Sequence, residues 1–531
     1  MAVEDQPVRL NQFEHPRLTL IVEKGISEKR CIVRQDVGHQ RTLIVGAVYT
    51  SEAADNTLDL SHGTGSITAA VRHCIGRHPI LSAVIVGGDG ERPEFATPKQ
   101  LDLSNHVHVR HREESLTENS LIEKLLAEVS DEQFSSVDST PPWKLVLTPL
   151  RSGQDSTTRL LVLFAYYHSH GDGKSGLAFH QSFLEGLSQN TTSDQITSDQ
   201  TCEPCLKPLP PPIEKAGKLS LSWSFLLSPL IGTYIPSFLA SALGFRASWI
   251  AQSNEIWRGK DHTFDPNNFQ TGLTMFTIDH DTMHHALQRC KARQTTFTAL
   301  LTHLIAQSLS ELVPAPAFAA QIVIDLRHLF EGAYTAETMT NCVSAYSELI
   351  PGTPPTTQPA AATKWTHPAN PIWLAARKTR AELVAASSTL HNQPIGLLQY
   401  LSAFRPWTLS QIGKPRESSY EISNLVIFDP VPVSVPKASA RPPPGSSSER
   451  EPHRSAKKIT IEKTFFSQPA NAAGACLNFN CVSTKGGPLV GTVTWQRGVL
   501  GLGEGKDEGG FVRRVCGRVG GLVEELAGVA G

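Results

Sequence analysis

The chain has 531 residues, a formal net charge of −2 and 40% hydrophobic residues. This length exceeds what one compact core usually holds, so we expect two subdomains or more. The near-neutral charge gives no electrostatic argument for binding nucleic acid or an anionic membrane surface. The nine cysteines are odd in number and irregularly spaced, and the C-x-x-C at Cys202 and Cys205 lacks the second pair of a zinc site, which favours free thiols in a reducing compartment.

The first 188 residues alternate predicted strands and helices. The first 17 residues contain no apolar core of a signal peptide, which favours a cytoplasmic protein. Strands are expected at 18–22, 43–49, 80–86, 107–110, 143–147 and 160–166. Apolar residues recur at helical spacing in 66–77, 120–129 and 177–187. We interpret 1–188 as one α/β half of the protein.

Residues 189–270 are predicted to be a linker or crossover segment. The stretch 189–212 is polar and then rich in proline. Residues 219–245 carry no charge and are long enough to span a bilayer, but six serines and the prolines Pro229 and Pro236 dilute them. A buried or peripheral segment is therefore favoured over a spanning helix, with a weak contact at a membrane interface as the alternative.

The second half is predicted to cover 271–531 and again mixes strands with helices. Its expected strands are 273–279, 322–326, 421–428, 459–466, 475–483 and 489–495. Its expected helices are 281–290, 295–312, 372–386 and 511–526. Residues 435–457 have the composition of a disordered insertion.

The loop after the apolar run 160–166 contains the residues best suited to chemistry. It reads His168-Ser-His170-Gly-Asp172-Gly173-Lys-Ser, and a predicted helix follows it. A histidine has an unperturbed pKa of about 6.5, so His168 can take a proton from a hydroxyl at neutral pH. Asp172 lies four residues on and can fix the turn or pair with an arginine elsewhere. Loops held between rigid elements often carry catalytic residues.

Two other chemistries fit this loop less well. His168, His170 and Asp172 form most of the H-x-H-x-D-H pattern of metallohydrolases, but Gly173 replaces the final histidine ligand. The Gly173-Lys174-Ser175 sequence imitates the end of a P-loop, but His168 stands where that pattern requires glycine. The chain has 20 histidines, so a histidine and an aspartate at this spacing can occur by chance. The flanking strand, helix and glycine are what make this pair a candidate for function.

The loop resembles the H-H-x-x-x-D-G motif of the chloramphenicol acetyltransferase-like superfamily, and the chain most resembles its fungal alcohol acetyltransferase family. Tyr167 replaces the first histidine, and the D-F-G-W-G motif of the plant branch is absent. The order of several short motifs carries the resemblance: His78-Pro79-Ile80-Leu81, Ile256-Trp257-Arg258-Gly259, Thr295-Thr296-Phe297-Thr298, Asp325-Leu326-Arg327, Glu421-Ile422-Ser423-Asn424, Phe466-Ser467-Gln468, Gly486-Gly487 and Trp495-Gln496.

The resemblance implies an α/β (α+β) fold of two subdomains, each a mixed sheet covered by helices, with a tunnel between the halves. It implies transfer of an acetyl or short acyl group from acetyl-CoA to an alcohol, with His168 as general base and no metal or permanently bound cofactor. Gly173, Ser423 and Asn424 become candidates for the tunnel wall or for donors to an oxyanion, and Asp172 is assigned to holding the loop, with Arg327 as its candidate partner.

We further expect a monomeric cytoplasmic enzyme of secondary metabolism, with peripheral association with an internal membrane as the alternative. Three alternatives stay open: acylation of an amine, a metallohydrolase built on His168, His170 and Asp172, and a binding protein that keeps the fold without catalysis. The residues that bind acetyl-CoA, the identity of the acceptor and the length of the acyl chain are not predicted.

Overall fold

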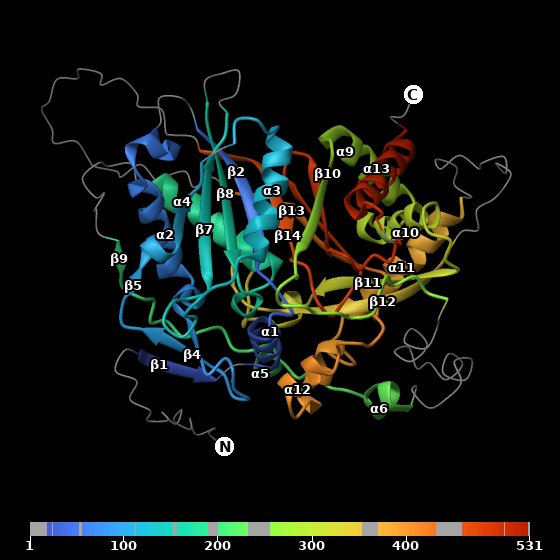
Figure 1. Ribbon diagram of the computed structural model, residues 1–531, viewed down its shortest axis with the longest axis horizontal. Helices are drawn as coiled ribbons and strands as arrows, with labels where there is room; N and C mark the ends of the chain where they lie inside the picture. Colours follow the sequence, from blue (N-terminus) through green and yellow to red (C-terminus); the bar gives the residue numbers. More distant parts are fainter. Residues whose placement is uncertain are drawn as a thin grey trace, which may run out of the picture.

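The computed structural model describes residues 18–23, 25–51, 56–111, 113–151, 157–189, 200–231, 255–352, 370–431, 459–503 and 505–528. The predicted insertion 435–457 and the linker residues 190–199 and 232–254 lie outside these ranges. Figure 1 shows two halves side by side, each with a central sheet. The prediction of an α/β fold with two sheet-and-helix halves is confirmed.

The first half is built on a five-stranded sheet in the order β14-β2-β8-β7-β6. Its central strand β8 is a continuous apolar run, and residues 160–166 are fully buried. The strands are β2 (Leu43–Ser51), β6 (Val107–Val109), β7 (Trp143–Pro149), β8 (Thr158–Tyr166) and β14 (Thr460–Ser467). The last of these is supplied by the C-terminal part of the chain and pairs antiparallel with β2. The N-terminal sheet is therefore completed by a strand that begins at Thr460, some 290 residues after β8 ends at Tyr166.

Helices cover both faces of this sheet. α2 (Gly65–Arg77) and α4 (Gly173–Gln189) pack together on one face, and α3 (Glu118–Asp131) covers the other. α1 (Ile26–Asp36) lies at the boundary between the halves, as Figure 1 shows. Small sheets complete this half, formed by β1 (Leu18–Glu23), β3 (Val84–Val86) and β4 (Glu94–Pro98), and by β5 (Leu101–Asp102) with β9 (Thr201–Cys202).

The second half is built on a six-stranded sheet in the order β10-β16-β15-β13-β11-β12. The strands are β10 (Thr271–Ile278), β11 (Ala317–Asp325), β12 (Val343–Pro351), β13 (Tyr420–Phe428), β15 (Leu477–Thr484) and β16 (Leu489–Gln496). Its core is shared with α9 (His280–Ala292), α10 (Phe297–Ser310), α11 (Pro371–Ser387) and α13 (Glu508–Ala527). Three shorter helices are α5 (Ile213–Ala216), α6 (Trp223–Ile231) and α12 (Phe404–Leu409).

Several local predictions differ from the structure. The strand expected at 80–86 is only β3, because Pro79 starts a 3-10 turn that runs from Pro79 to Ser82. α1, β4, β12 and α12 were not predicted. α1 in particular carries charged residues between its apolar ones, so its sequence shows little helical periodicity.

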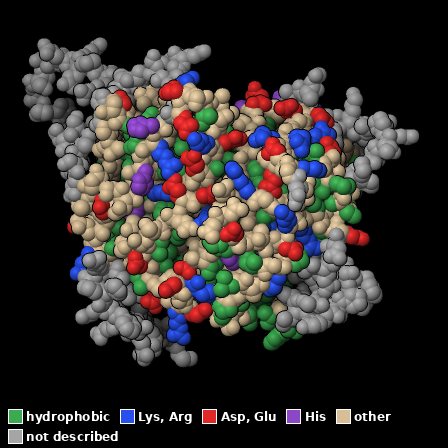
Figure 2. Space-filling model, in the orientation of Figure 1, with side chains coloured by type: hydrophobic (Ala, Val, Ile, Leu, Met, Phe, Trp, Pro, Cys, Tyr) green, Lys and Arg blue, Asp and Glu red, His purple; other side chains and the backbone are tan. Residues whose placement is uncertain are grey.

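The surface agrees with the near-zero net charge. Basic and acidic side chains are interspersed over the face drawn in Figure 2, without a large field of one sign. No helix within the described ranges is long and apolar enough to cross a membrane. Of the uncharged stretch 219–245, α6 is described; its Trp223 is 78% exposed. All nine cysteines are free.

Candidate active site

Strand β8 delivers His168 to the boundary between the halves. The strand ends at Tyr166, a 3-10 turn follows from His168 to His170, and α4 begins at Gly173. Gly171 has φ of +153°, and a Cβ there would lie 2.5 Å from the Cβ of Ser175, so this tight turn requires glycine. The Tyr166 hydroxyl donates to the Asp172 carbonyl at 2.6 Å and closes the turn on the strand.

The hydrogen bonds of His168 select its tautomer. Its Nδ1 lies 3.0 Å from the carbonyl oxygen of Gly171, which can only accept, and this contact favours the tautomer with the proton on Nδ1. Nε2 then keeps a lone pair for a substrate proton. Burial lowers the pKa of His168, while the negative charge of Asp172 opposes this shift. The imidazole is therefore neutral at pH 7, which is the form that a general base needs.

Two residues without a recognisable sequence signal hold the backbone of His168. The Nδ2 of Asn341 donates to the carbonyl of His168 at 3.2 Å and lies 3.2 Å from its Nδ1. With its amide oxygen turned toward the loop, Gln35 of α1 accepts from the backbone N–H of His168 at 2.9 Å. Both halves and α1 therefore fix the position of the imidazole.

The Asp172 side chain is held by Arg327. The two side chains form a bidentate pair, with Nη1–Oδ2 and Nη2–Oδ1 distances of 2.8 Å each. Asp172 also accepts from the backbone N–H groups of Cys342 and Ser175, at 3.0 and 3.1 Å, and from the Ser175 hydroxyl at 3.2 Å. Burial favours a raised pKa for Asp172, but the Arg327 guanidinium and these hydrogen bonds bring the pKa below its usual value.

This pair joins the two halves. Arg327 follows β11 of the second half and is almost as buried as Asp172, with exposed side-chain fractions of 6% and 3%. Its guanidinium also donates to the Thr340 carbonyl at 2.8 Å and contacts Asp325 at 3.1 Å. The geometry gives Asp172 and Arg327 a structural role, since a bidentate contact fixes the loop against the second sheet.

The three residues of the alternative metal site are directed to different partners. The Nε2 of His170 lies 2.9 Å from the Ala83 carbonyl, and its ring stacks edge-on against Phe95. His168 uses Nδ1 for Gly171, and Asp172 is occupied by Arg327. Within the described ranges, no group of three or more histidine, cysteine or acidic residues is arranged to hold a metal ion.

The candidates on β13 lie on opposite faces of the strand. Residues 420 and 422 contribute to the core of the second half, whereas Leu425 contributes to the core of the first. By the alternation of a strand, Ser423 shares the face of Leu425, which packs at the end of the histidine loop beside Gly173. Asn424 faces the other way and donates to the Thr298 hydroxyl at 3.0 Å.

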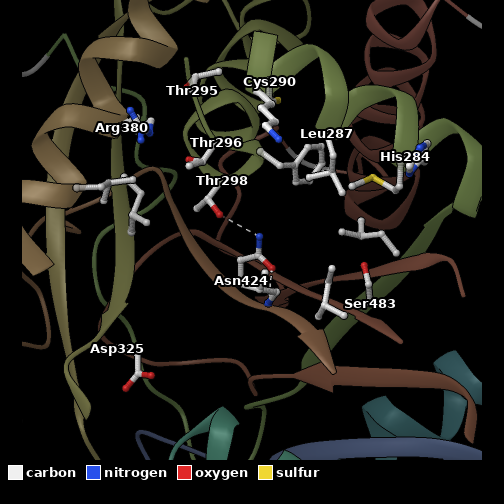
Figure 3. Close-up of a pocket in the computed structure, with 18 of the residues that line it drawn as sticks. His284, Leu287, Cys290, Thr295, Thr296, Thr298, Asp325, Arg380, Asn424 and Ser483 are labelled. Carbon is white, nitrogen blue, oxygen red and sulfur yellow. Dashed lines mark hydrogen bonds between the residues drawn. The ribbon is translucent and has the colours of Figure 1, made fainter. Parts of the chain in front are cut away.

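A pocket of about 820 Å³ lies on the Asn424 side of β13. Figure 3 shows side chains from α9, the start of α10, β11, α11 and β13 directed into it. Three partly or fully exposed cations, Lys291, Arg380 and Lys485, line it, with Asp325 at the edge nearest the histidine loop. None of these lining cations was predicted, because they stand singly in segments far apart in the sequence.

One edge of this pocket lies close to the start of α4, the helix that follows the histidine loop. The parallel strands β11 and β13 pair only from Ala320–Tyr420 to Ile322–Ile422 and then separate. The pocket is lined by the separated parts, residues 323–325 and 426–427. Asp325 in turn lies 3.9 Å from Lys174, in the first turn of α4. Asp325 at this edge of the pocket is therefore close to the element that begins directly after the histidine loop.

Comparison with known proteins agrees with this arrangement. Residues 112–327 match the family model described as alcohol acetyltransferase. A probable alcohol acetyltransferase, FCK4 of Fusarium pseudograminearum, is 23% identical over 82% of each chain. Another, crmB of Aspergillus fumigatus, is 21% identical over 85% of this chain and 88% of its own.

Solved structures share the fold. The trichothecene 15-O-acetyltransferase TRI3 of Fusarium sporotrichioides matches with a TM-score of 0.65 and 12% identity, over 95% of both chains. The condensation domain of the monacolin K polyketide synthase MokA matches with a TM-score of 0.55 and 12% identity, over 96% of this chain and 98% of its own. The chain is therefore an acyltransferase, and the resemblance of its sequence to alcohol acetyltransferases is confirmed.

Proposed function

We propose that the chain transfers an acetyl group from acetyl-CoA to the hydroxyl of a small alcohol, with Nε2 of His168 as the general base. The observation that carries this assignment is the 3.0 Å contact between Nδ1 of His168 and the Gly171 carbonyl, which favours a proton on Nδ1 and a lone pair on Nε2. The alcohol acetyltransferase domain supports the choice of donor and of acceptor class. A lowered pKa keeps the base neutral at working pH.

The chemical step needs only this base and a donor to the developing oxyanion. Nε2 takes the hydroxyl proton while the alcohol oxygen attacks the thioester carbonyl, which gives a tetrahedral oxyanion. The intermediate collapses, the C–S bond breaks, and the imidazolium returns its proton to the thiolate of CoA. A positioned base contributes roughly 10²–10⁴-fold, and an oxyanion donor adds about 10²–10³-fold. Ser423, on the face of β13 toward the first half, is our candidate donor.

Acetyl-CoA would enter from the pocket beside Asn424. Its phosphates are anionic, and Lys291, Arg380 and Lys485 supply positive charge at the rim. The N-terminus of α10, capped by Thr296, opens into the same space and favours negative charge. The acyl group would then pass beside the separated ends of β11 and β13 toward His168.

A thiol-release assay tests this function. Purified protein is incubated with acetyl-CoA or longer acyl-CoA donors and with pools of alcohols, sterols, sphingoid bases and amines. We expect free CoA and an acetyl ester, identified by mass spectrometry, in at least one alcohol pool. Transfer only to amines would show that the acceptor is an amine and not an alcohol. An absence of thioester cleavage across the panel, from folded protein, would support a binding protein without catalysis.

A further inference from the structure

Strand β13 contains a β-bulge at the wall of the pocket. Asn424 pairs with Cys481 of β15, and Ile427 pairs with Ser483, so two residues of β13 stand opposite one residue of β15. Such a bulge inserts one extra residue into a strand and bends it, and it is often found beside active sites, where it redirects a side chain. Because side chains alternate along a strand, one extra residue also reverses the alternation of those that follow.

The bulge determines which side chains of β13 face the pocket. Leu425 and Phe428 both pack in the core of the first half, although residues three apart on a regular strand point to opposite faces. Val426 and Ile427 lie between them and line the pocket, where they are 54% and 52% exposed and so present apolar surface to it. On a regular strand Ile427 would share the face of Leu425. The bulge therefore places Ile427 in the pocket wall.

This arrangement holds Val426 in an unfavourable backbone conformation. Its φ is +67°, in the left-handed region that favours glycine. Of the four non-glycine residues with positive φ in the described ranges, Val426 alone is β-branched, and a branched side chain is a genuine outlier there. Residues in such conformations persist only where the surrounding structure holds them, and they are concentrated at functional sites.

The side chain of Asn424 supplies this hold. Its Oδ1 accepts from the backbone N–H of Val426 at 2.9 Å, which closes a turn over the bulge. Its Nδ2 donates to the hydroxyl of Thr298 at 3.0 Å, in the first turn of α10 (Figure 3). The Val426 N–H can only donate, so the amide oxygen faces it and the amide nitrogen faces Thr298. Both polar atoms of the amide have partners within the protein, and they tie the bulge to α10.

We propose that Asn424 is a positioning residue, which sets the affinity for acyl-CoA through the bulge in β13 and not by contact with the donor. This inference rests on the proposed function, in which acyl-CoA occupies the pocket beside Asn424. The Asn424 amide keeps Val426 at positive φ, and Ile427 then gives the pocket an apolar wall, which suits the methyl and methylene groups of the pantetheine arm. Without the amide, Val426 would favour extended backbone, and Ile427 would turn out of the wall.

A double-mutant cycle on Asn424 and Val426 tests the inference. Asn424→Ala removes both hydrogen bonds, and we expect KM for acetyl-CoA to rise about three- to tenfold while kcat stays within about twofold of wild type. Glycine adopts positive φ without strain, so the bulge of Val426→Gly does not need the amide. Adding Asn424→Ala to Val426→Gly should therefore change KM by less than about twofold. Val426→Gly is the reference for this step, which corrects for the lost valine side chain.

Asp102 provides the matched control, because its Oδ1 accepts from the Ser104 N–H at 3.0 Å in the same kind of turn and lies outside the pocket. Asp102→Ala should keep the wild-type KM. An unchanged KM in Asn424→Ala, or the same rise in both backgrounds, would overturn the inference while acetyl transfer by wild type remained established. Absence of transfer by the wild-type protein would instead refute the proposed function. If thermal unfolding shows that Asn424→Ala does not fold, Thr298→Val, which removes one of the two hydrogen bonds, takes its place in the cycle under the same criteria.

Discussion

Replacing Asp172 with asparagine tests whether the Asp172–Arg327 pair holds the two halves together. The Asp172 carboxylate accepts five hydrogen bonds: two from Arg327, one from Cys342 and two from Ser175. The amide of asparagine has only one acceptor oxygen. Its NH2 group would therefore face N–H or O–H donors, with which it cannot form hydrogen bonds. The buried guanidinium also loses its counter-charge. Breaking such a pair typically costs about 3–5 kcal/mol, and we expect that loss in the free energy of unfolding.

Urea unfolding of the full chain measures this loss. Arg518 and Glu311 form a surface pair about one-third exposed, and Glu311→Gln should cost at most about 1 kcal/mol. The double variant Asp172→Asn with Arg327→Met removes the unpaired charge and should recover part of the stability. If Asp172→Asn costs no more than Glu311→Gln while unfolding remains cooperative, the assigned role of the pair is wrong.

Three further predictions concern the site. Because burial lowers the pKa of His168, kcat/KM should fall only as pH drops below about 6.5, where imidazole protonates; an acid limb above this value in a pH profile would contradict the lowered pKa of His168. Lys291→Ala should raise KM for acetyl-CoA about two- to fivefold and lessen its salt dependence, as steady-state kinetics at two ionic strengths would show. Gly173→Ala places a Cβ 2.7 Å from Leu425 and 2.9 Å from Phe466, and should cost about 1–3 kcal/mol of stability by urea unfolding; a neutral effect would refute the close packing of the halves there.

The sequence predicted the site best where the reactive side chains and the elements that hold them are adjacent along the chain. The apolar run 160–166, the glycine-bounded turn and the following helix were predicted from adjacent residues, and they place His168 at the boundary between the halves. Arg327 could be named as a candidate because Asp325-Leu326-Arg327 is one of the ordered motifs. Its contact with Asp172, 155 residues away, depends on the packing of two sheets, which no local pattern encodes.

The remaining site residues are determined by tertiary structure alone. α1 was missed because charged residues interrupt its apolar positions, yet it supplies Gln35, which accepts from the backbone N–H of His168. Ser423 and Asn424 were proposed together, but alternation along β13 sends them to opposite faces. The exchange of β14 into the first sheet likewise follows from pairing across the whole chain, because its own sequence resembles that of any other strand.

The most direct measurement of the central claim is the turnover of His168→Ala, with His285→Ala as control because His285 is exposed on α9 and lies outside the pocket. With acetyl-CoA and an accepted alcohol, His168→Ala should lose about 10²–10⁴-fold in kcat while acetyl-CoA binding, measured by calorimetry, and thermal unfolding stay close to wild type. The control should keep its turnover. Near-normal kcat in folded His168→Ala would contradict the assignment of His168 as the general base.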